Sequence, residues 1–233
     1  MLRKTWTFFL LTFAISWLLW LPGVLRSNGF DSLPEIVGLP GMFAVFGPTI
    51  AAFVLIGREQ GRAGMGRLLR RAFDVGFQAR WWLPTLFLFP LLGLLTLGAL
   101  NLLGAELPDW TAPTLITALV TAVFILFLGG GLEEFGWRGY ALDRMQTGQN
   151  ALIVSLVLGL FWGLWHLPLF FIDTSTQAQA DIPVWEFVLQ TMVLAVLYTW
   201  LYNNTRGSLL VAILFHTLGN TTSALLPPRS GAG

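Results

Sequence analysis

Residues 128–144 read LGGGLEEFGWRGYALDR, and this stretch decides how the rest of the chain is interpreted. The adjacent carboxylates Glu133 and Glu134, followed by the cation Arg138, come directly after a long apolar run. Ionised side chains are costly inside a membrane and usually mark function there. The stretch therefore predicts a buried polar site on an otherwise apolar segment.

The composition around this stretch is typical of an integral membrane protein. Of the 233 residues, 55% are hydrophobic and 11% are charged, and the mean hydropathy is +0.72. An average soluble domain has roughly 25% charged residues. The chain has no cysteine, which excludes disulfides, thiolate catalysis and cysteine-ligated metals. The net charge of +1 is uninformative as a total, and we expect no nucleic-acid partner.

Seven apolar segments have the length of membrane spans, which need about 20 residues each. Between the second and third, residues 58–80 contain six arginines and only two acidic residues, which predicts a cytoplasmic loop by the positive-inside rule. The N-terminus is then cytoplasmic as well. The expected spans are residues 6–25, 40–57, 81–103, 114 into the acidic stretch, 151–172, 184–202 and 208–226.

These segments predict an all-α integral membrane protein, a bundle of about seven transmembrane helices with an intramembrane polar site. We expect a polar connector over residues 139–150, with an eighth half-span around residues 140–150 as the alternative. The whole chain, residues 1–233, is expected to be one polytopic domain, and its motif-bearing core covers about residues 114–226. We expect the protein to reside in a bacterial cytoplasmic membrane.

The two carboxylates of the central stretch are expected to do different jobs. Glu134 and Arg138 are four residues apart, so on a helix they can form an ion pair that either orients the helix end or supports a site. Glu133 points about 100° away from Glu134 and has no such partner in its own turn. The glycines at positions 129–131 predict close packing by another helix, or approach by an extended peptide.

The two histidines of the chain, His166 and His216, both lie within apolar segments, in FWGLWHLP and ILFHTLGN. His216 shares a helix face with Asn220, and His166 follows Trp162 on the same face. Any one of these groups alone is explained by helix packing, which polar side chains support for less than about 2 kcal/mol each. Taken together, they predict one polar site assembled from three spans.

This single-site hypothesis meets a difficulty of depth. The predicted fourth span places Glu133 near the cytoplasmic face and His166 deeper, about 15 Å away by the helical rise per residue. A shared site therefore requires that the spans be tilted, and broken near Gly129 and Pro168.

Three motifs on these segments resemble those of the intramembrane CAAX-protease and bacteriocin-processing (CPBP) family, the relatives of the Ras-converting prenyl-protein endopeptidase. The resemblance covers about residues 124–223. Trp162 stands where the phenylalanine of the second motif is usual, a departure that concerns the shape of the pocket more than its chemistry. The matching residues are Glu133, Glu134 and Arg138 of EExxxR, His166 of FxxxH, and His216 and Asn220 of HxxxN/D.

The resemblance implies an endopeptidase that opens to the cytoplasm and hydrolyses a peptide bond near a lipid-facing or prenylated carboxyl end. Its partners would be the lipid bilayer and a membrane-associated peptide or protein substrate. The implied roles are Glu133 as the general base on water, His166 as a holder of that water, His216 and Asn220 as stabilisers of the oxyanion, and Glu134 with Arg138 as support.

Alternatives remain open for the cofactor and for the function. We expect no cofactor, but Glu133, His166 and His216 are also a plausible ligand set for zinc. The same intramembrane groups would serve a proton-coupled carrier as a relay, although the inverted repeat common in carriers is not visible. A catalytically silent scaffold or immunity protein that binds a membrane peptide is the third class.

Overall fold

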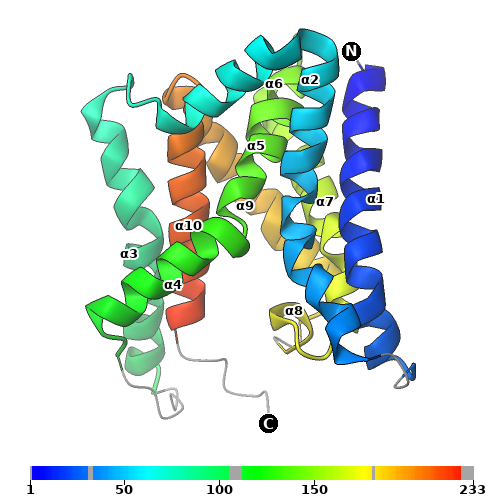
Figure 1. Cartoon of the computed structure of the whole chain (residues 1–233). Coiled ribbons are helices and arrows are strands. Elements are labelled where there is room, and N and C mark those ends of the chain that lie inside the picture. Colours follow the sequence, from blue (N-terminus) through cyan, green and yellow to red (C-terminus); the bar gives the residue numbers. More distant parts are fainter. Residues whose placement is uncertain (1, 31–33, 105–111, 180–181, 227–233) are drawn as a thin grey trace.

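The computed structural model describes residues 2–30, 34–104, 112–179 and 182–226, and all regular structure in these ranges is helical (Figure 1). Six helical segments there are long and apolar enough to cross a membrane, and the 17-residue α10 occupies the seventh predicted segment. The prediction of an all-α integral membrane bundle is confirmed. The long helices are α1 (Leu2–Ser27), α2 (Gly47–Arg70), α3 (Trp82–Leu102), α4 (Leu115–Leu128), α7 (Ala151–Trp165), α9 (Val184–Asn204) and α10 (Leu209–Leu225).

Short helical elements connect these spans or extend them. The 3-10 segments are η1 (Glu35–Phe46), η2 (Arg71–Phe73), η3 (Ala79–Trp81), η4 (Gly131–Glu133) and η6 (Leu167–Phe171). The others are α5 (Glu134–Gly136), the π-helix η5 (Trp137–Leu142), α6 (Asp143–Met145) and α8 (Thr176–Gln179).

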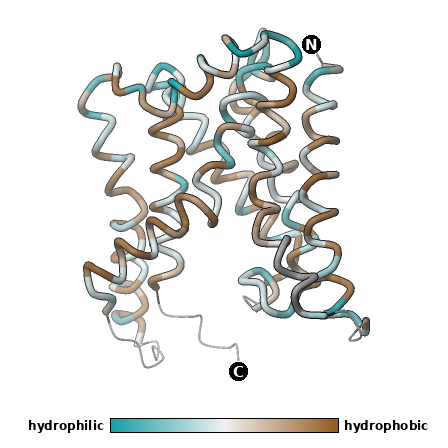
Figure 2. The backbone as a smooth tube through the Cα atoms, viewed as in Figure 1, coloured by the Kyte–Doolittle hydropathy of each residue, from teal (hydrophilic) through white to brown (hydrophobic). Residues whose placement is uncertain are grey.

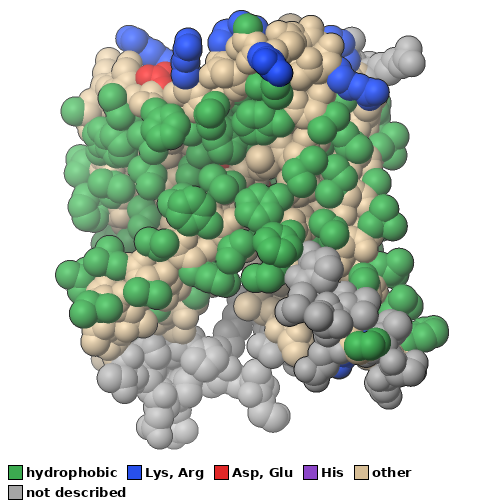
Figure 3. Space-filling view, viewed as in Figure 1, with side chains coloured by type: hydrophobic (Ala, Val, Ile, Leu, Met, Phe, Trp, Pro, Cys, Tyr) green, Lys and Arg blue, Asp and Glu red, His purple; other side chains and the backbone are tan. Residues whose placement is uncertain are grey.

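The bundle has one strongly basic end and an apolar middle. Lysine and arginine side chains gather at the end where α1 begins, above a broad band of hydrophobic side chains (Figure 3). The same end is the more hydrophilic one along the backbone of α1 and α2 (Figure 2). This distribution is the one that the positive-inside rule associates with a cytoplasmic face.

The second span is longer than expected, and part of the predicted arginine-rich loop is helical. We expected a loop to begin at Arg58, but α2 continues to Arg70. It bends at Gly61, whose φ of 63° and ψ of −164° are not helical. Beyond this bend the chain runs across the basic end of the bundle instead of leaving it (Figure 1). A glycine has no Cβ and adopts a positive φ without the steric cost that other residues meet.

The fourth span differs most from the expectation, because it does not end at the acidic stretch. One apolar helical segment runs from Leu115 to Met145, 31 residues in all. At 1.5 Å per residue this is about 46 Å, longer than the roughly 30 Å of a hydrocarbon core. The extra length is accommodated by an oblique path of α4 (Figure 1) and by a break after Leu128.

The break in this span corrects two expectations of the sequence analysis. Gly130 has a φ of 113°, in the left-handed region, and the chain resumes as η4, α5 and the π-helix η5. Residues 139–142, expected at the start of a polar connector, are buried in η5. Residues 131–145 therefore complete the fourth crossing, and they form neither an exposed connector nor an eighth half-span.

The fifth span also ends early, as its proline predicts. Helix α7 stops at Trp165, His166 caps it, and the 3-10 helix η6 follows with Pro168 in its first turn. Helix α7 packs closely on α9, because a Cβ added at Gly159 would lie 2.5 Å from the Cα of Met192. This contact fixes the depth of the residues that precede His166.

Candidate active site

Glu133 is buried in the middle of the bundle and is held by two tryptophans. Its Oε2 accepts a hydrogen bond from Trp137 Nε1 at 3.0 Å and another from Trp162 Nε1 at 3.2 Å. The carboxylate is 3% exposed. An indole N–H can only donate, so both rings are compatible with an ionised carboxylate. Because Trp137 comes from η5 and Trp162 from α7, the carboxylate is fixed from two directions.

Glu134 lies between a cation and an imidazole. Its Oε1 is 2.8 Å from Arg138 Nη1 and 2.8 Å from His216 Nδ1. The i,i+4 pair expected from the sequence is therefore present, fully buried, and it also includes a histidine from α10. A carboxylate oxygen accepts, so Nδ1 of His216 carries the proton and donates it to this bond. The other nitrogen, Nε2, is thereby directed away from Glu134.

Gly130 is the point at which these two arrangements meet. A Cβ added there would lie 2.7 Å from His216 Nε2 and 3.1 Å from Glu133 Oε1. Glu133 Oε1 and His216 Nε2, the two atoms that do not take part in the bonds described above, thus face the same small region beside the glycine. The positive φ of Gly130 brings the backbone into this position, and only a residue without a Cβ fits so close to these two atoms.

Neighbouring helices hold the broken segment in place. Asn220 Nδ2 of α10 donates to the carbonyl oxygen of Gly129 at 2.8 Å, and Thr49 Oγ1 of α2 donates to that of Leu132 at 2.5 Å. The helix break frees these backbone groups, and side chains from other helices commonly satisfy such groups in membranes. Asn220, expected as an oxyanion donor, has its amide N–H engaged with the backbone beside Gly130.

Aromatic rings surround the buried guanidinium group of Arg138. Its Cζ lies 4.3 Å from the centroid of the Tyr198 ring and 4.9 Å from that of Trp162. Its Nε and Nη2 make no hydrogen bond within the described part of the chain. The attraction between a cation and an aromatic face is strengthened when both are removed from water. Arg138 is therefore held by one carboxylate and two rings, which fixes Glu134 in turn.

His166 belongs to the same cluster, but it does not contact Glu133 directly in this structure. Its Nδ1 lies 2.8 Å from the carbonyl oxygen of Trp162, so this nitrogen is the donor and Nε2 is free to act as an acceptor. The imidazole packs on Trp165 and Phe187, with ring centroids 4.7 and 5.1 Å away. It is close enough to His216 for an electrostatic interaction.

The difficulty of depth is resolved by the two broken spans. Since the fourth span breaks at Gly130 and continues for another half-crossing, Glu133 lies midway through it and reaches Trp162 of α7. His166 follows Trp162 by one helical turn. The structure therefore brings Glu133, Trp162 and His216 into direct contact. His166 joins this group through its contact with the ring of Trp162.

The same geometry bears on the zinc alternative. Among the described residues, no three histidine, aspartate or glutamate side chains are grouped closely enough to hold one metal ion. A zinc site requires three protein ligands or more. The set Glu133, His166 and His216 does not fit a metal ion as it stands.

Trp137 and Thr49 are site residues that the sequence analysis missed. Trp137 lies inside the quoted motif, four residues after Glu133, at the spacing that predicted the neighbouring pair of Glu134 and Arg138. That spacing was the available signal. Thr49 offers no signal in the sequence, since its partner is a backbone carbonyl 83 residues away.

Comparison with known proteins gives two matches. A family model described as type II CAAX prenyl endopeptidase Rce1-like matches residues 114–222, a range that contains every predicted site residue. The CAAX prenyl protease 2 of Methanococcus maripaludis is 29% identical over 229 residues, covering 94% of this chain and 83% of the relative. Together with the three motifs and the all-helical membrane fold, these matches show that the chain is similar to the Rce1-like CAAX prenyl endopeptidases.

Proposed function

We propose that this protein is an intramembrane endopeptidase that hydrolyses a peptide bond by water that Glu133 activates. The observation that carries the proposal is the shared region beside Gly130, which both Glu133 Oε1 and His216 Nε2 face. A general base must lie within hydrogen-bond reach of the proton that it removes. A water molecule taken up in this region would be within reach of both atoms.

In the proposed reaction, Glu133 takes one proton from water, and the resulting hydroxide adds to the carbonyl carbon of the scissile bond. The tetrahedral intermediate collapses with cleavage of the C–N bond, and Glu133 returns the proton to the leaving amine. Trp137 and Trp162 keep the carboxylate oriented throughout. A preorganised base of this kind avoids the cost of reorganisation during reaction.

His216 is the best-placed residue to stabilise developing negative charge. Its Nδ1 is bonded to Glu134, which directs Nε2 toward the region beside Gly130, and in the protonated ring Nε2 is a donor. A donor aimed at an oxyanion is worth about 3 kcal/mol in the transition state. Asn220 supports the same step by fixing Gly129, and His166, as the family motif implies, helps to hold the water.

The proposed substrate is a membrane-associated protein or peptide with a prenylated carboxyl terminus. The support is the similarity to the relative from Methanococcus maripaludis, a CAAX prenyl protease. We further propose that the basic end of the bundle faces the cytoplasm and that the N-terminus lies there, as the distribution of lysine and arginine favours.

The test is cleavage of matched prenylated and unprenylated peptides by the purified protein in detergent, with the cut located by mass spectrometry. Glu133→Gln keeps an acceptor for both tryptophans and removes only the base, so we expect cleavage to be lost. Asp173→Asn, at an exposed carboxylate beyond η6, is the matched control and should cleave normally. Undiminished turnover by Glu133→Gln would refute the proposal.

A further inference from the structure

A separate polar cavity lies at the basic end of the bundle, where the second half of α2 meets the segment that follows the candidate active site. Its volume is about 240 Å³. This is roughly eight times the share of liquid volume that one water molecule occupies. The polar residues that line it are Gln60, Arg67, Arg71, Asp143 and Arg144, and the rest of the lining is Ile56, Gly64, Leu68 and Gly139.

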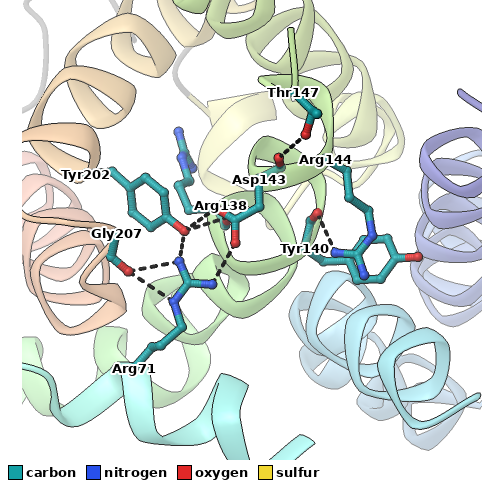
Figure 4. Close-up of polar contacts among 8 residues, drawn as sticks. All are labelled: Arg71, Arg138, Tyr140, Asp143, Arg144, Thr147, Tyr202 and Gly207. Carbon is teal, nitrogen blue, oxygen red and sulfur yellow. Dashed lines mark hydrogen bonds and ion pairs between the residues drawn. The ribbon is translucent and has the colours of Figure 1, made fainter. Parts of the chain in front are cut away.

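The charges around this cavity are predominantly positive. Three guanidinium groups and one carboxylate line it. Arg71 pairs with Asp143 at 2.6 Å, and Arg144 pairs at 2.8 Å with Glu59, which lies behind it. Figure 4 shows Arg71 and Arg144 approaching from two different helices, with Asp143 between them.

Arg67 is the cation of this group without an acidic partner among the described residues. Its Nη2 donates to the amide oxygen of Gln60 at 2.7 Å, a neutral acceptor on the same helix. The guanidinium group is therefore held over the cavity with its charge uncompensated. A planar guanidinium offers paired N–H donors that match the oxygens of phosphate groups.

We propose that this cavity binds a phosphate group, presented by an anionic lipid headgroup or by a soluble phosphate compound. Arg67 is the principal ligand, and Arg71 and Arg144, which also line the cavity, add positive charge beside it. The bend at Gly61 supports the proposal, because it lays the arginine-bearing half of α2 across the basic end of the bundle (Figure 1). Basic pockets between membrane helices are known to bind such headgroups.

The decisive experiment measures lipid retention by native mass spectrometry of the detergent-purified full chain. The protein is titrated with phosphatidylglycerol and, separately, with phosphatidylcholine, whose headgroup carries a compensating cation. We expect one phosphatidylglycerol to bind preferentially, and Arg67→Gln to weaken it by about tenfold, as expected for loss of a charge-assisted hydrogen bond. Arg70→Gln is the matched control, because Arg70 is exposed on the same helix but does not line the cavity.

Three outcomes would overturn the proposal. In the first, the wild-type chain retains both lipids equally and does not bind inorganic pyrophosphate. In the other two, Arg67→Gln and Arg70→Gln lose ligand binding to the same extent, or neither variant loses it. Pyrophosphate, added alone and in competition with the lipid at constant ionic strength, identifies the source. Binding of pyrophosphate alone with loss in Arg67→Gln assigns the site to a soluble phosphate compound. Retention of phosphatidylglycerol that pyrophosphate does not displace assigns it to lipid. Thermal unfolding of each variant verifies that it folds.

Discussion

Trp137 and Trp162, which come from the fourth and fifth spans, donate their indole N–H groups to one and the same oxygen of Glu133. Two donors on one oxygen leave the other oxygen, Oε1, outside this pair of bonds, and they set the direction in which it points. The carboxylate is thus oriented by residues from two spans, and its geometry depends on how those spans pack.

The first prediction concerns this orientation. Trp137→Phe keeps the ring but removes one N–H group, so we expect kcat for peptide cleavage to fall by about tenfold to a hundredfold while KM changes little, as for loss of a hydrogen bond to a charged group. Steady-state kinetics on a fluorogenic peptide would measure it. Trp185→Phe, at an exposed tryptophan, is the control and should retain wild-type rates. Equal kcat values for the two variants would contradict the assignment.

The second prediction concerns the buried charges of Glu134 and Arg138. Glu134→Leu leaves the guanidinium group unpaired, and removal of one partner of a buried ion pair costs about 3–5 kcal/mol in the free energy of unfolding. The double variant Glu134→Leu/Arg138→Met should recover most of this stability in thermal unfolding. Cleavage should stay low in both, because His216 has lost its acceptor. A double variant that cleaves like the wild type would show that Glu134 has no part in catalysis.

The third prediction concerns Gly130. An alanine there meets two separate penalties, a φ of 113° and contact with His216 Nε2 at 2.7 Å, so Gly130→Ala should abolish cleavage. Gly148→Ala separates the two effects, because Gly148 has a φ of 73° and open space around it. We expect this control to lose about 1–2 kcal/mol of stability through backbone strain and to remain active. Activity in Gly130→Ala would place the reacting water elsewhere.

The fourth prediction distinguishes two roles for Asn220. If its main task is to hold the Gly129 carbonyl, then Thr49→Val, which releases the Leu132 carbonyl, should lower kcat in the same way as Asn220→Ala. Each lost hydrogen bond is expected to cost about 1 kcal/mol of stability. Kinetics and thermal unfolding measured on both variants provide the comparison. A large kcat effect in Asn220→Ala with none in Thr49→Val would favour direct contact with the oxyanion.

The fifth prediction concerns metal dependence. Since no three-ligand group occurs among the described residues, we expect cleavage to be unchanged by 1,10-phenanthroline and the purified protein to contain no stoichiometric zinc. Elemental analysis and chelator titration would measure these. Loss of activity on chelation, restored by zinc, would show that the side chains regroup around a metal.

Much of this architecture was predictable from the sequence, because apolar length and residue spacing are local properties. The seven segments follow from runs of apolar residues, and the pairing of Glu134 with Arg138 follows from helical periodicity. The break at Gly130 was harder to predict, since membrane helices tolerate glycine and the same residues also predict helix packing. The depth assigned to Glu133 was wrong for this reason.

The partners of the polar residues were less predictable than the residues themselves. The resemblance implies that Asn220 stabilises the oxyanion, and its spacing does not predict the bond seen in the structure, in which its amide donates to a carbonyl that becomes available because α4 ends at Leu128. His216 was expected to be near the carboxylates, but its bond to Glu134 instead of Glu133 depends on the rotation of α10. Such choices are made by tertiary packing, which residue spacing within one helix does not encode.

The broken fourth span also constrains the order in which the protein is assembled during its synthesis. The apolar half, α4, can enter the bilayer as soon as it is made, but residues 131–138 carry two carboxylates and a guanidinium group, and both carboxylates have a partner that lies later in the chain. Trp162 is made next, and His216 is made last, in α10. The acidic half of the span therefore acquires its final environment only when α10 has been inserted. A ribosome-bound chain that is stalled before α10 contains Glu133 and Glu134 but lacks the histidine that completes their surroundings.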